Sequence, residues 1–155
     1  MIQLTLLQPQ HHLSLMYSLD DEQSKFTRPP HEWLDNHTLD VHKIVIVSDD
    51  EVVGFFVLDQ GDNKYHYTDD QNSLLLRSMS INPAHQGKGY AKQALMRLGE
   101  FICHHGLHAN KVVLGVHHKN ITAQALYQKV GFVRTSKDYM GIKGLQYSYE
   151  LVINS

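Results

Sequence analysis

The pattern of hydrophobic and polar residues predicts strands and helices that alternate along the chain. Apolar runs rich in β-branched residues predict strands at residues 2–6, 43–47, 52–58, 73–81, 111–116, 132–135 and 145–153. Apolar spacing and capping residues predict helices at residues 9–19, 31–37, 89–105 and 120–130. Strands before and after the long helix 89–105 imply a right-handed crossover, and hence a mixed sheet in an α/β fold.

Finer features of this pattern give further expectations. The weaker helical pattern of residues 9–19 carries the apolar residues Leu13, Met16 and Tyr17. Ser48-Asp49-Asp50-Glu51, between two strong strands, predicts a hairpin. Two polar stretches predict connecting loops, at residues 20–30 and 59–72.

The size and composition of the chain favour one domain. With 155 residues, 42% of them hydrophobic, it is long enough to bury a core without disulfides or a metal. It contains no internal repeat, low-complexity tract or linker, so residues 1–155 are expected to form a single domain. The one cysteine, Cys103, excludes an internal disulfide framework and fits the reducing cytoplasm.

Charge and hydropathy restrict the classes of molecule to which this chain is expected to bind. The formal net charge of −2 provides no basic field of the kind that binds nucleic acid or an anionic membrane. Residues 1–7 lack a positively charged region and a small-residue cleavage site, which argues against a signal peptide, and no apolar run approaches the length of a membrane span. We therefore expect a soluble, cytoplasmic protein without nucleic-acid or membrane partners, and leave a homodimer open.

Twelve histidines are the one unusual feature of the composition. They occur singly or as adjacent pairs, and neighbouring side chains do not share one face of a helix or strand. His104 and His108 have the spacing of helical metal ligands, but Gly106 between them is expected to end the helix. Nothing resembles the HExxH motif, so we expect solvated surface histidines and no metal.

A glycine turn predicts a phosphate pocket. A hydrophobic strand is joined to the long helix by the segment Ser80-Ile81-Asn82-Pro83-Ala84-His85-Gln86-Gly87-Lys88-Gly89-Tyr90-Ala91. Gly87 and Gly89 have no Cβ, so backbone N–H groups can converge on a ligand. The start of the helix adds unpaired N–H groups and the positive end of its dipole. Together these features suit a phosphate or a pyrophosphate.

Three nucleotide-binding patterns can be compared with this turn. A Walker P-loop requires GxxxxGK[ST], which the sequence lacks. A dinucleotide fingerprint would begin at Gly87 and Gly89, but its third glycine position is Lys92, and no acidic residue lies about twenty residues further on. The pattern [RQ]xxGx[GA] is satisfied by Gln86, Gly89 and Ala91, and here the sequence resembles the GNAT superfamily of N-acetyltransferases.

The second motif of that family is NxxAxxLYxxxGF, and residues 120–132 match it at every fixed position. Asn120 is expected to cap the helix and Leu126 to pack into the core, ahead of a buried strand that begins at Phe132. Alone, Tyr127 would be interpreted as a half-buried core residue whose hydroxyl bonds to the backbone. Two motifs in the right order and at the right separation favour the GNAT resemblance instead.

The resemblance implies a GNAT acyltransferase fold, a central twisted mixed sheet flanked by helices, with acetyl-CoA as cosubstrate. It implies a cofactor arm that runs along the backbone near Met79 and Ile81, with the pyrophosphate in the glycine turn. It also implies that Tyr127 is the catalytic general acid, which protonates the departing sulfur. The cofactor-binding residues that it implies are Met79, Ile81, Gln86, Gly87, Lys88, Gly89, Tyr90, Ala91, Asn120 and Ala123.

The general base is left open by the sequence. Some relatives use a glutamate on the strand after the long helix, but here that strand carries Gly115 near the corresponding place. His117, at the end of the strand, is a candidate because histidine suits proton uptake near neutrality, although an exposed loop histidine would look the same. A water chain, Asp59 or Asp69 would also serve.

The acceptor is expected to enter over residues 17–33, opposite the cofactor. Carboxylates there and nearby favour a cationic amine such as a polyamine or an amino sugar, although a solvated acidic loop has the same composition. They are Asp20, Asp21, Glu22, Glu32, Asp69 and Asp70. The predicted function is transfer of the acetyl group of acetyl-CoA to a primary amine. The alternatives are acetylation of protein or peptide N-termini, and a catalytically silent CoA-binding module.

Overall fold

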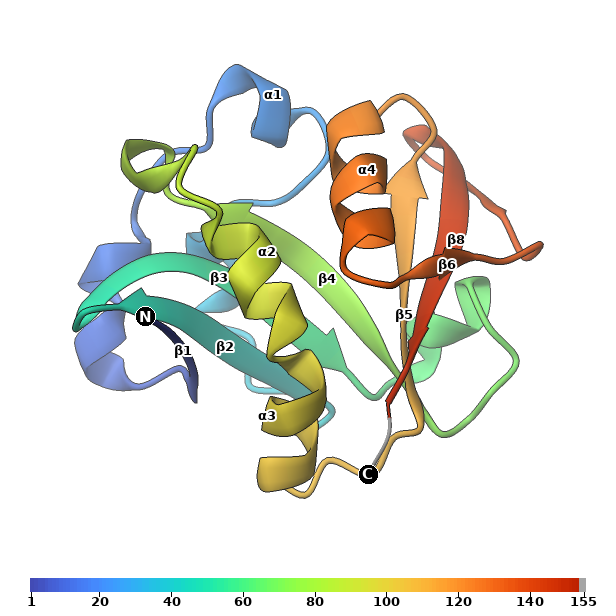
Figure 1. Ribbon diagram of the computed structural model, residues 1–155, viewed down its shortest axis with the longest axis horizontal. Coiled ribbons are helices and arrows are strands. Elements are labelled where there is room, and N and C mark those ends of the chain that lie inside the picture. The colour runs from blue at the N-terminus through green and yellow to red at the C-terminus, as the bar shows by residue number, and fades with distance from the viewer. Residues whose placement is uncertain (154–155) are drawn as a thin grey trace. The chain divides into compact units, whose positions relative to one another are not determined.

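The computed structural model describes residues 1–153, which form a mixed α/β fold with an eight-stranded sheet (Figure 1). The chain divides into two compact units. Unit 1 comprises Met1–Leu58 and Arg77–Arg97, and unit 2 comprises Asp59–Leu76 and the chain from Leu98 onward. Strand β4 (Ser73–Ile81) contributes its second half to unit 1 and its first half to unit 2. The predicted fold class is confirmed.

Unit 1 contains strands in the order β1-β2-β3-β4. β1 (Ile2–Leu6) runs antiparallel to β2 (Val41–Ser48). β2 and β3 (Glu51–Asp59) are joined by Asp49 and Asp50, whose φ values are 49° and 68°. Two left-handed residues in succession form a turn whose twist matches that of the flanking strands. The predicted hairpin is therefore confirmed.

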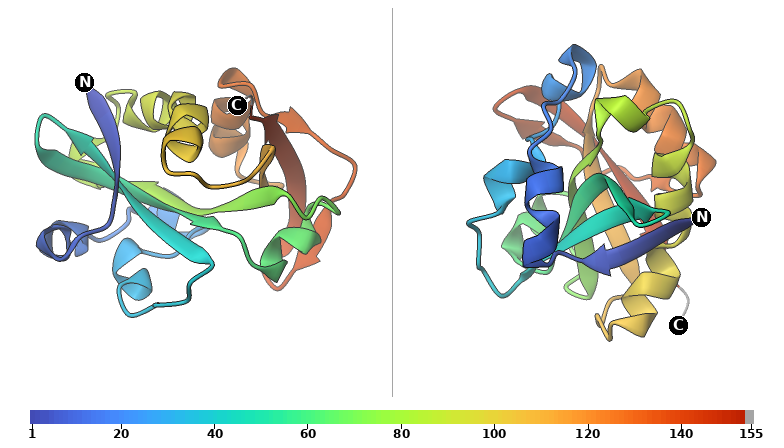
Figure 2. Two further views of the ribbon diagram at one scale, coloured as in Figure 1. Left: turned by 90° about the horizontal axis from the view of Figure 1, so that it is seen from below. Right: turned by 90° about the vertical axis from the view of Figure 1, so that its left-hand side faces the viewer.

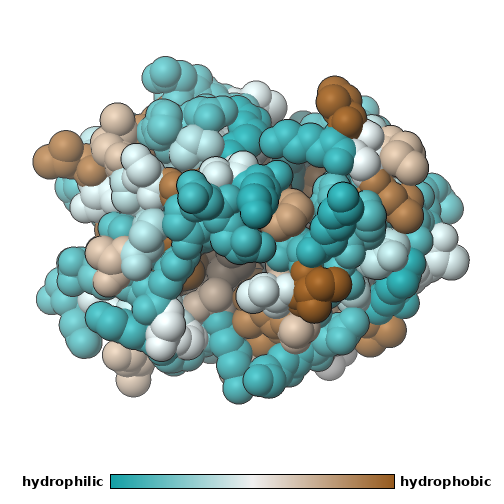
Figure 3. Space-filling model, turned by 90° about the horizontal axis from the view of Figure 1, so that it is seen from above, coloured by the Kyte–Doolittle hydropathy of each residue, from teal (hydrophilic) through white to brown (hydrophobic). Residues whose placement is uncertain are grey.

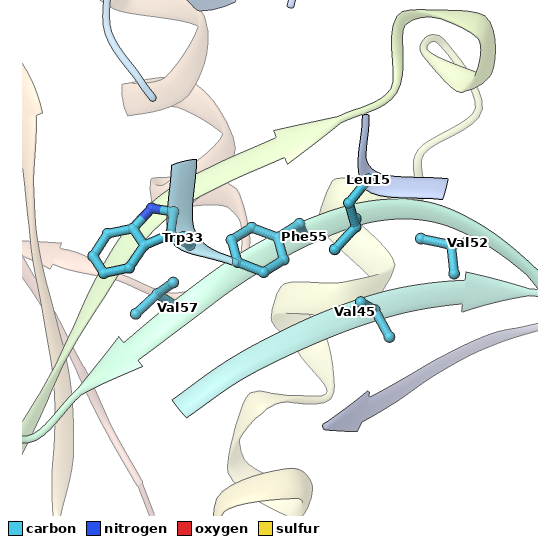
Figure 4. Close-up of a cluster of buried hydrophobic side chains, with 6 residues drawn as sticks. All are labelled: Leu15, Trp33, Val45, Val52, Phe55 and Val57. Carbon is cyan, nitrogen blue, oxygen red and sulfur yellow. The ribbon is translucent and has the colours of Figure 1, made fainter. Parts of the chain in front are cut away.

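One face of this sheet packs against the N-terminal segment (Figure 4). The cluster of buried side chains comprises Leu15, Trp33, Val45, Val52, Phe55 and Val57. The guanidinium groups of Arg28 and Arg77 lie 4.6 and 4.9 Å from the centre of the Trp33 ring. α2 (Tyr90–Met96) lies on the opposite face (Figure 2, left). Burial of both faces explains why the two central strands are nearly continuous apolar runs.

The N-terminal segment differs from its prediction. Residues 9–19 form two 3-10 turns instead of a helix. These turns are Pro9–His11 and Leu13–Leu15. Leu15 is buried in the second of these turns, whereas Leu13 and Met16, two of the apolar residues of the predicted helical pattern, are exposed.

A short helix lies where the sequence predicts a loop. α1 (Asp21–Ser24) begins after Asp20, whose carboxylate accepts a hydrogen bond from the N–H of Gln23 at 2.8 Å. An acidic N-cap followed three residues later by glutamine is a known helix-start pattern, so the signal is present in the sequence. The helix predicted at residues 31–37 is present as the 3-10 helix Pro30–Trp33.

Unit 2 contains strands in the order β4-β5-β8-β6, with β7 paired to β8. They are β5 (Lys111–His117), β6 (Val133–Arg134), β7 (Tyr139–Gly141) and β8 (Gly144–Val152). β4 and β5 run parallel, with Ser73 opposite Lys111, whereas β5 and β8 run antiparallel. The sheet is therefore mixed, as predicted. β7 was not predicted from the sequence, because three residues are too few to show a periodic pattern of apolar side chains.

The long helix predicted at residues 89–105 is divided at Arg97 into α2 and α3 (Leu98–His104). Arg97 has φ −100° and ψ 2°, and its N–H bonds to the C=O of Ala94, three residues back. Gly99, two residues further on, has a low helix propensity. The expected apolar positions are nevertheless buried: Ala94, Leu95, Leu98, Phe101 and Ile102.

Large apolar side chains on the surface are scattered. On the face shown in Figure 3, hydrophobic residues stand in separate groups among hydrophilic ones. Isolated apolar side chains are normal on a protein surface and mark no binding site by themselves. In the part of the chain that the structure describes, no helix is long and apolar enough to cross a membrane.

Candidate active site

The turn between β4 and α2 is built on two left-handed glycines. Gly87 has φ 80° and Gly89 has φ 76°, a region that residues with a side chain rarely adopt. A Cβ at Gly87 would meet no atom within 4 Å, and one at Gly89 only the side-chain amide of Gln93, at 3.9 Å. The glycines are therefore required by the backbone conformation and not by packing, and the space beside them is open.

Backbone N–H groups at this turn are not used by the helix. The first hydrogen bond of α2 runs from the N–H of Gln93 to the C=O of Gly89 at 3.1 Å. The N–H groups of Gly89 and of the next three residues therefore lie outside the helical ladder. The Tyr90 hydroxyl accepts a hydrogen bond from Ser48 at 3.4 Å, which fixes its ring, and Lys88 is exposed beside it. The turn thus offers N–H donors and a cation to an anionic ligand.

The strand before the turn is irregular. Ser78, within β4, has φ 54°, a left-handed conformation that is uncommon for a residue with a side chain. Such a residue in a strand is typical of a bulge, which redirects the strand and is frequent next to active sites. Met79 and Ile81, the two residues predicted to lie along the cofactor arm, follow this distortion directly.

Two side chains of the N-terminal segment bind the same end of β4. The Tyr17 hydroxyl lies 2.8 Å from the Oγ of Ser80. The Gln23 side chain binds Ile81 at two points, because its Nε2 donates to the C=O and its Oε1 accepts from the N–H, each at 3.1 Å. Burial raises the pKa of Tyr17 to about 12, and the bond to Ser80 opposes this shift. Sequence analysis missed both residues because 63 and 58 positions separate them from their partners.

The second motif lies in unit 2, at α4 (Ile121–Lys129) and its two ends. Asn120 caps the helix, and its Oδ1 accepts a hydrogen bond from the N–H of Ala123 at 3.2 Å. Gly131 follows the helix with φ 108°, as expected of a glycine that ends it, and Phe132 is buried. The predicted cap, helix end and burial of Phe132 are therefore confirmed.

Two packing predictions for this motif are wrong. Leu126 is only partly buried, because α4 packs through a half-buried stripe and contains no fully buried residue. The strand after Phe132, β6, is exposed at both of its residues. A two-residue strand at the edge of a sheet has little surface to bury, so the apolar start at Phe132 does not continue.

Tyr127 lies within the half-buried stripe of α4. Its ring meets that of Phe132 edge to face, with ring centres 5.5 Å apart. The residue as a whole keeps some exposed surface, but burial raises the pKa of its hydroxyl to about 12. Among residues 1–153 the hydroxyl has no hydrogen-bond partner. The structure therefore lacks the backbone partner that a purely structural tyrosine would be expected to have, and the phenol stays protonated at neutral pH.

The space beside Gly115, near which the family resemblance would place a glutamate base, is filled by a tyrosine ring. A Cβ at Gly115 would lie 2.2 Å from Cε1 of Tyr67 and 2.6 Å from its hydroxyl oxygen. Tyr67 itself contacts the rings of His66 and Tyr139, with ring centres 6.1 and 5.7 Å away. A side chain at position 115 would collide with Tyr67, which gives a physical reason for the glycine.

The other candidates for a general base are already engaged. The Nδ1 of His117 accepts a hydrogen bond from the N–H of Lys119 at 3.1 Å, so Nε2 carries the proton and donates to the C=O of Lys143 at 2.9 Å. Asp59 is buried and accepts a backbone N–H two residues on at 2.7 Å. Asp69 is exposed and forms an ion pair with a lysine. Each of these three groups therefore already has a hydrogen-bond or ion-pair partner.

Replacement of Gly115 tests the packing of Tyr67. We expect Gly115→Ala to lower the free energy of unfolding by about 1–3 kcal/mol, the usual cost of overpacking, as measured by chemical denaturation. Gly99→Ala is the matched control, because its Cβ would meet Ile153 at an ordinary 3.9 Å, and we expect it to cost nothing. An equally large loss from Gly115→Ala in a Tyr67→Ala background would contradict this account.

Each unit thus holds one part of the predicted site. The stretch from Met79 to Ala91 belongs to unit 1, and Asn120, Ala123 and Tyr127 belong to unit 2. In the chain up to residue 153, no group of three or more His, Cys, Asp or Glu side chains is arranged to hold a metal ion. The chemistry that both parts offer is binding of an anion and donation of a proton.

Comparison with known proteins points to the same class. The sequence profile of the acetyltransferase (GNAT) family matches residues 7–132. The chain is 34% identical over 149 residues to "Uncharacterized N-acetyltransferase YbbJ" of Bacillus subtilis (strain 168), and the alignment covers 94% of this chain and 93% of the relative.

Solved structures of N-acetyltransferases share the fold. Aminoglycoside acetyltransferase AAC(6')-Ib in complex with coenzyme A and kanamycin has a TM-score of 0.70 at 16% identity, over 98% of this chain and 95% of that chain. Spermidine N-acetyltransferase from Vibrio cholerae in complex with CoA and spermine has a TM-score of 0.69 at 20% identity, over 97% and 95%. At these identities the likeness concerns the fold alone.

The fold and the two motifs define an N-acetyltransferase that depends on acetyl-CoA. The chain belongs to the GNAT family of acetyltransferases. The family predicted from the two motifs is thereby confirmed, and so is the enzyme class, because the family match extends over both motifs and the bacterial relative is an N-acetyltransferase.

Proposed function

We propose that this enzyme transfers the acetyl group of acetyl-CoA to a small primary amine, either a polyamine or an amino sugar. The observation that carries the catalytic part of the proposal is the state of Tyr127. Its hydroxyl has a pKa raised by burial to about 12 and no hydrogen-bond partner among the described residues, and it belongs to a complete family motif. A hydroxyl with a perturbed pKa and without a protein partner is suited to act on a ligand.

The cofactor would be held chiefly by backbone groups. The open turn at Gly87 and Gly89 supports binding of the pyrophosphate, with Lys88 as a nearby cation. Met79 and Ile81 would present the backbone groups that align the pantetheine arm. Contacts of this kind fix the thioester in position, which is the largest part of catalysis when the chemistry itself is undemanding.

The transfer itself needs three events. The neutral amine nitrogen attacks the thioester carbonyl carbon and forms the new C–N bond. The C–S bond then breaks, and the departing sulfur receives the proton of the Tyr127 hydroxyl. The amine nitrogen loses its extra proton to water, which also restores the proton of Tyr127. No step requires a carboxylate at position 115, where Tyr67 fills the space.

The choice of a small amine rests on two supports of unequal strength. The relatives of known structure are named for aminoglycosides and spermidine, both of which are cationic amines. The acidic N-terminal segment supports the choice less than its composition suggests. Asp20 caps α1, and Glu22 and Glu32 each form an ion pair with a nearby basic residue. Because exposed ion pairs are weak, the basic neighbours do not cancel the negative charge of these carboxylates, which still make the local electrostatic potential more negative.

The rate is expected to follow the ionisation of the acceptor. Only the neutral amine reacts, so kcat/KM should rise with pH between about pH 6 and about pH 10, towards the pKa of the amine. Tyr127 does not titrate in this range, because burial raises its pKa to about 12. The measurement is kcat/KM against pH for two amines of different basicity.

The pH profiles of these two amines distinguish proton loss to water from proton loss to a base on the protein. A midpoint that moves with the basicity of the amine supports proton loss to water. A midpoint common to both amines would reveal a base on the protein and contradict this mechanism. Turnover of short peptides at their N-termini, with no small amine accepted, would replace the proposed acceptor by a peptide.

A further inference from the structure

Gln23 binds the end of β4, just before the glycine turn, on the side of the strand that faces away from β3. The N–H of Asn82 bonds to the C=O of Val53 on β3 at 2.8 Å. Successive residues of a strand direct their backbone groups to opposite sides, so the N–H and C=O of Ile81 face away from β3. The Gln23 carboxamide binds both of these groups at 3.1 Å.

The position of this carboxamide is set by local hydrogen bonds. The N–H of Gln23 donates to the Asp20 side chain at 2.8 Å, and its C=O accepts from the N–H groups of Phe26 and Thr27 at 3.0 Å. The backbone of Gln23 is therefore held at both of its polar groups. Its side chain projects from this turn onto Ile81, which is 8% exposed.

A carboxamide copies the hydrogen-bonding pattern of a secondary amide. It offers one N–H donor and one C=O acceptor to the backbone, as a neighbouring strand does. The pantetheine arm of coenzyme A contains two secondary amides, which offer the same pair. Under the proposed function this arm lies along Met79 and Ile81, so Gln23 and the cofactor require the same two groups of Ile81.

We propose that Gln23 is an intramolecular competitor of acetyl-CoA and thereby sets the affinity of the enzyme for its cofactor. This inference rests on the proposed path of the pantetheine arm. The Gln23 carboxamide forms hydrogen bonds with the N–H and the C=O of Ile81, a buried strand residue. Without a partner, these two buried polar groups would destabilise the fold. Cofactor binding requires the carboxamide to leave. Departure of the carboxamide breaks the hydrogen bonds between α1 and β4 at Ile81, whereas the hydrogen bond between Tyr17 and Ser80 remains.

The test is the affinity for coenzyme A of variants that lack the carboxamide. Gln23→Met keeps the length of the side chain without its hydrogen bonds, and Gln23→Ala removes the whole group. We expect both to bind coenzyme A about tenfold more tightly than the wild type in calorimetry, because two hydrogen bonds of ordinary net strength no longer have to be broken. Ser24→Ala is the matched control. Within residues 1–153 its hydroxyl bonds only inside α1, to the C=O of Asp21 at 3.1 Å, so the affinity of this variant should equal that of the wild type.

A second measurement requires no variant. The side-chain amide resonances of Gln23, assigned through its own backbone, should shift on titration of the wild type with coenzyme A. Unchanged resonances, or affinities in the Gln23 variants equal to or weaker than that of the wild type, would overturn the inference while leaving the proposed function intact. If the wild type itself does not bind coenzyme A, the proposed function fails, and this inference fails with it.

Discussion

Gly89→Asp is expected to abolish the stabilisation that coenzyme A gives to the enzyme. At a hundredfold excess of ligand over Kd, the wild type should gain about 2.7 kcal/mol, seen as a clear rise in Tm. In the variant a carboxylate stands at the turn proposed to hold the pyrophosphate. Repulsion between the two anions, together with the lost space, should prevent binding. Thermal denaturation with and without coenzyme A measures the effect, and NAD should give little shift with either protein.

The variant is expected to fold. The φ of 76° at Gly89 makes any side chain there costly, but aspartate tolerates this region better than most residues. Gly106→Asp is the matched control, because Gly106 also has a left-handed φ, of 64°, and its Cβ would also stand in open space, with no atom within 4 Å, whereas a Cβ at Gly89 would meet only Gln93 at 3.9 Å. It should lower Tm similarly and keep the full response to coenzyme A. An equal response in Gly89→Asp and the wild type would contradict the phosphate site.

Tyr127→Phe is expected to lower kcat about 10²-fold and to leave the affinity for acetyl-CoA nearly unchanged. A thiolate is a much better leaving group than an alkoxide, so a general acid contributes towards the low end of the usual ~10²–10⁴. The substitution keeps the ring and its contact with Phe132 and removes only the hydroxyl. Because the hydroxyl has no partner among residues 1–153, we expect no loss of stability. Steady-state kinetics and thermal denaturation measure both quantities.

A second tyrosine provides the control for this experiment. The hydroxyl of Tyr149, in the same unit, accepts a hydrogen bond from the Gln128 side chain at 3.1 Å, and the residue is buried. Tyr149→Phe should therefore lower Tm and leave kcat nearly unchanged, the opposite pattern. If Tyr127→Phe lowers Tm by several degrees and leaves kcat unchanged, Tyr127 has a structural role and the proposed proton donor is wrong.

The sequence by itself determined the local elements of this protein and its family. Strands such as β4 are recognisable because a long apolar run reflects burial that is continuous along the chain. Asn120 and Gly131 are recognisable because a helix cap and a helix end depend on residues only a few positions apart. The two family motifs are equally local, so they identify the acetyltransferase without any knowledge of the packing.

Only the tertiary structure decided how distant residues meet at the candidate site. Gln23 binds Ile81 across 58 positions, and Tyr67 fills the space over Gly115 across 48 positions of the sequence. The left-handed Ser78 within β4 carries no local sequence signal. Each of these features depends on the packing of side chains or on strand geometry that neighbouring residues do not determine. Hydrophobic spacing records which residues are buried and not which residues they contact, and for that reason the contact of Gln23 with Ile81 and the packing of Tyr67 over Gly115 were visible only in the fold.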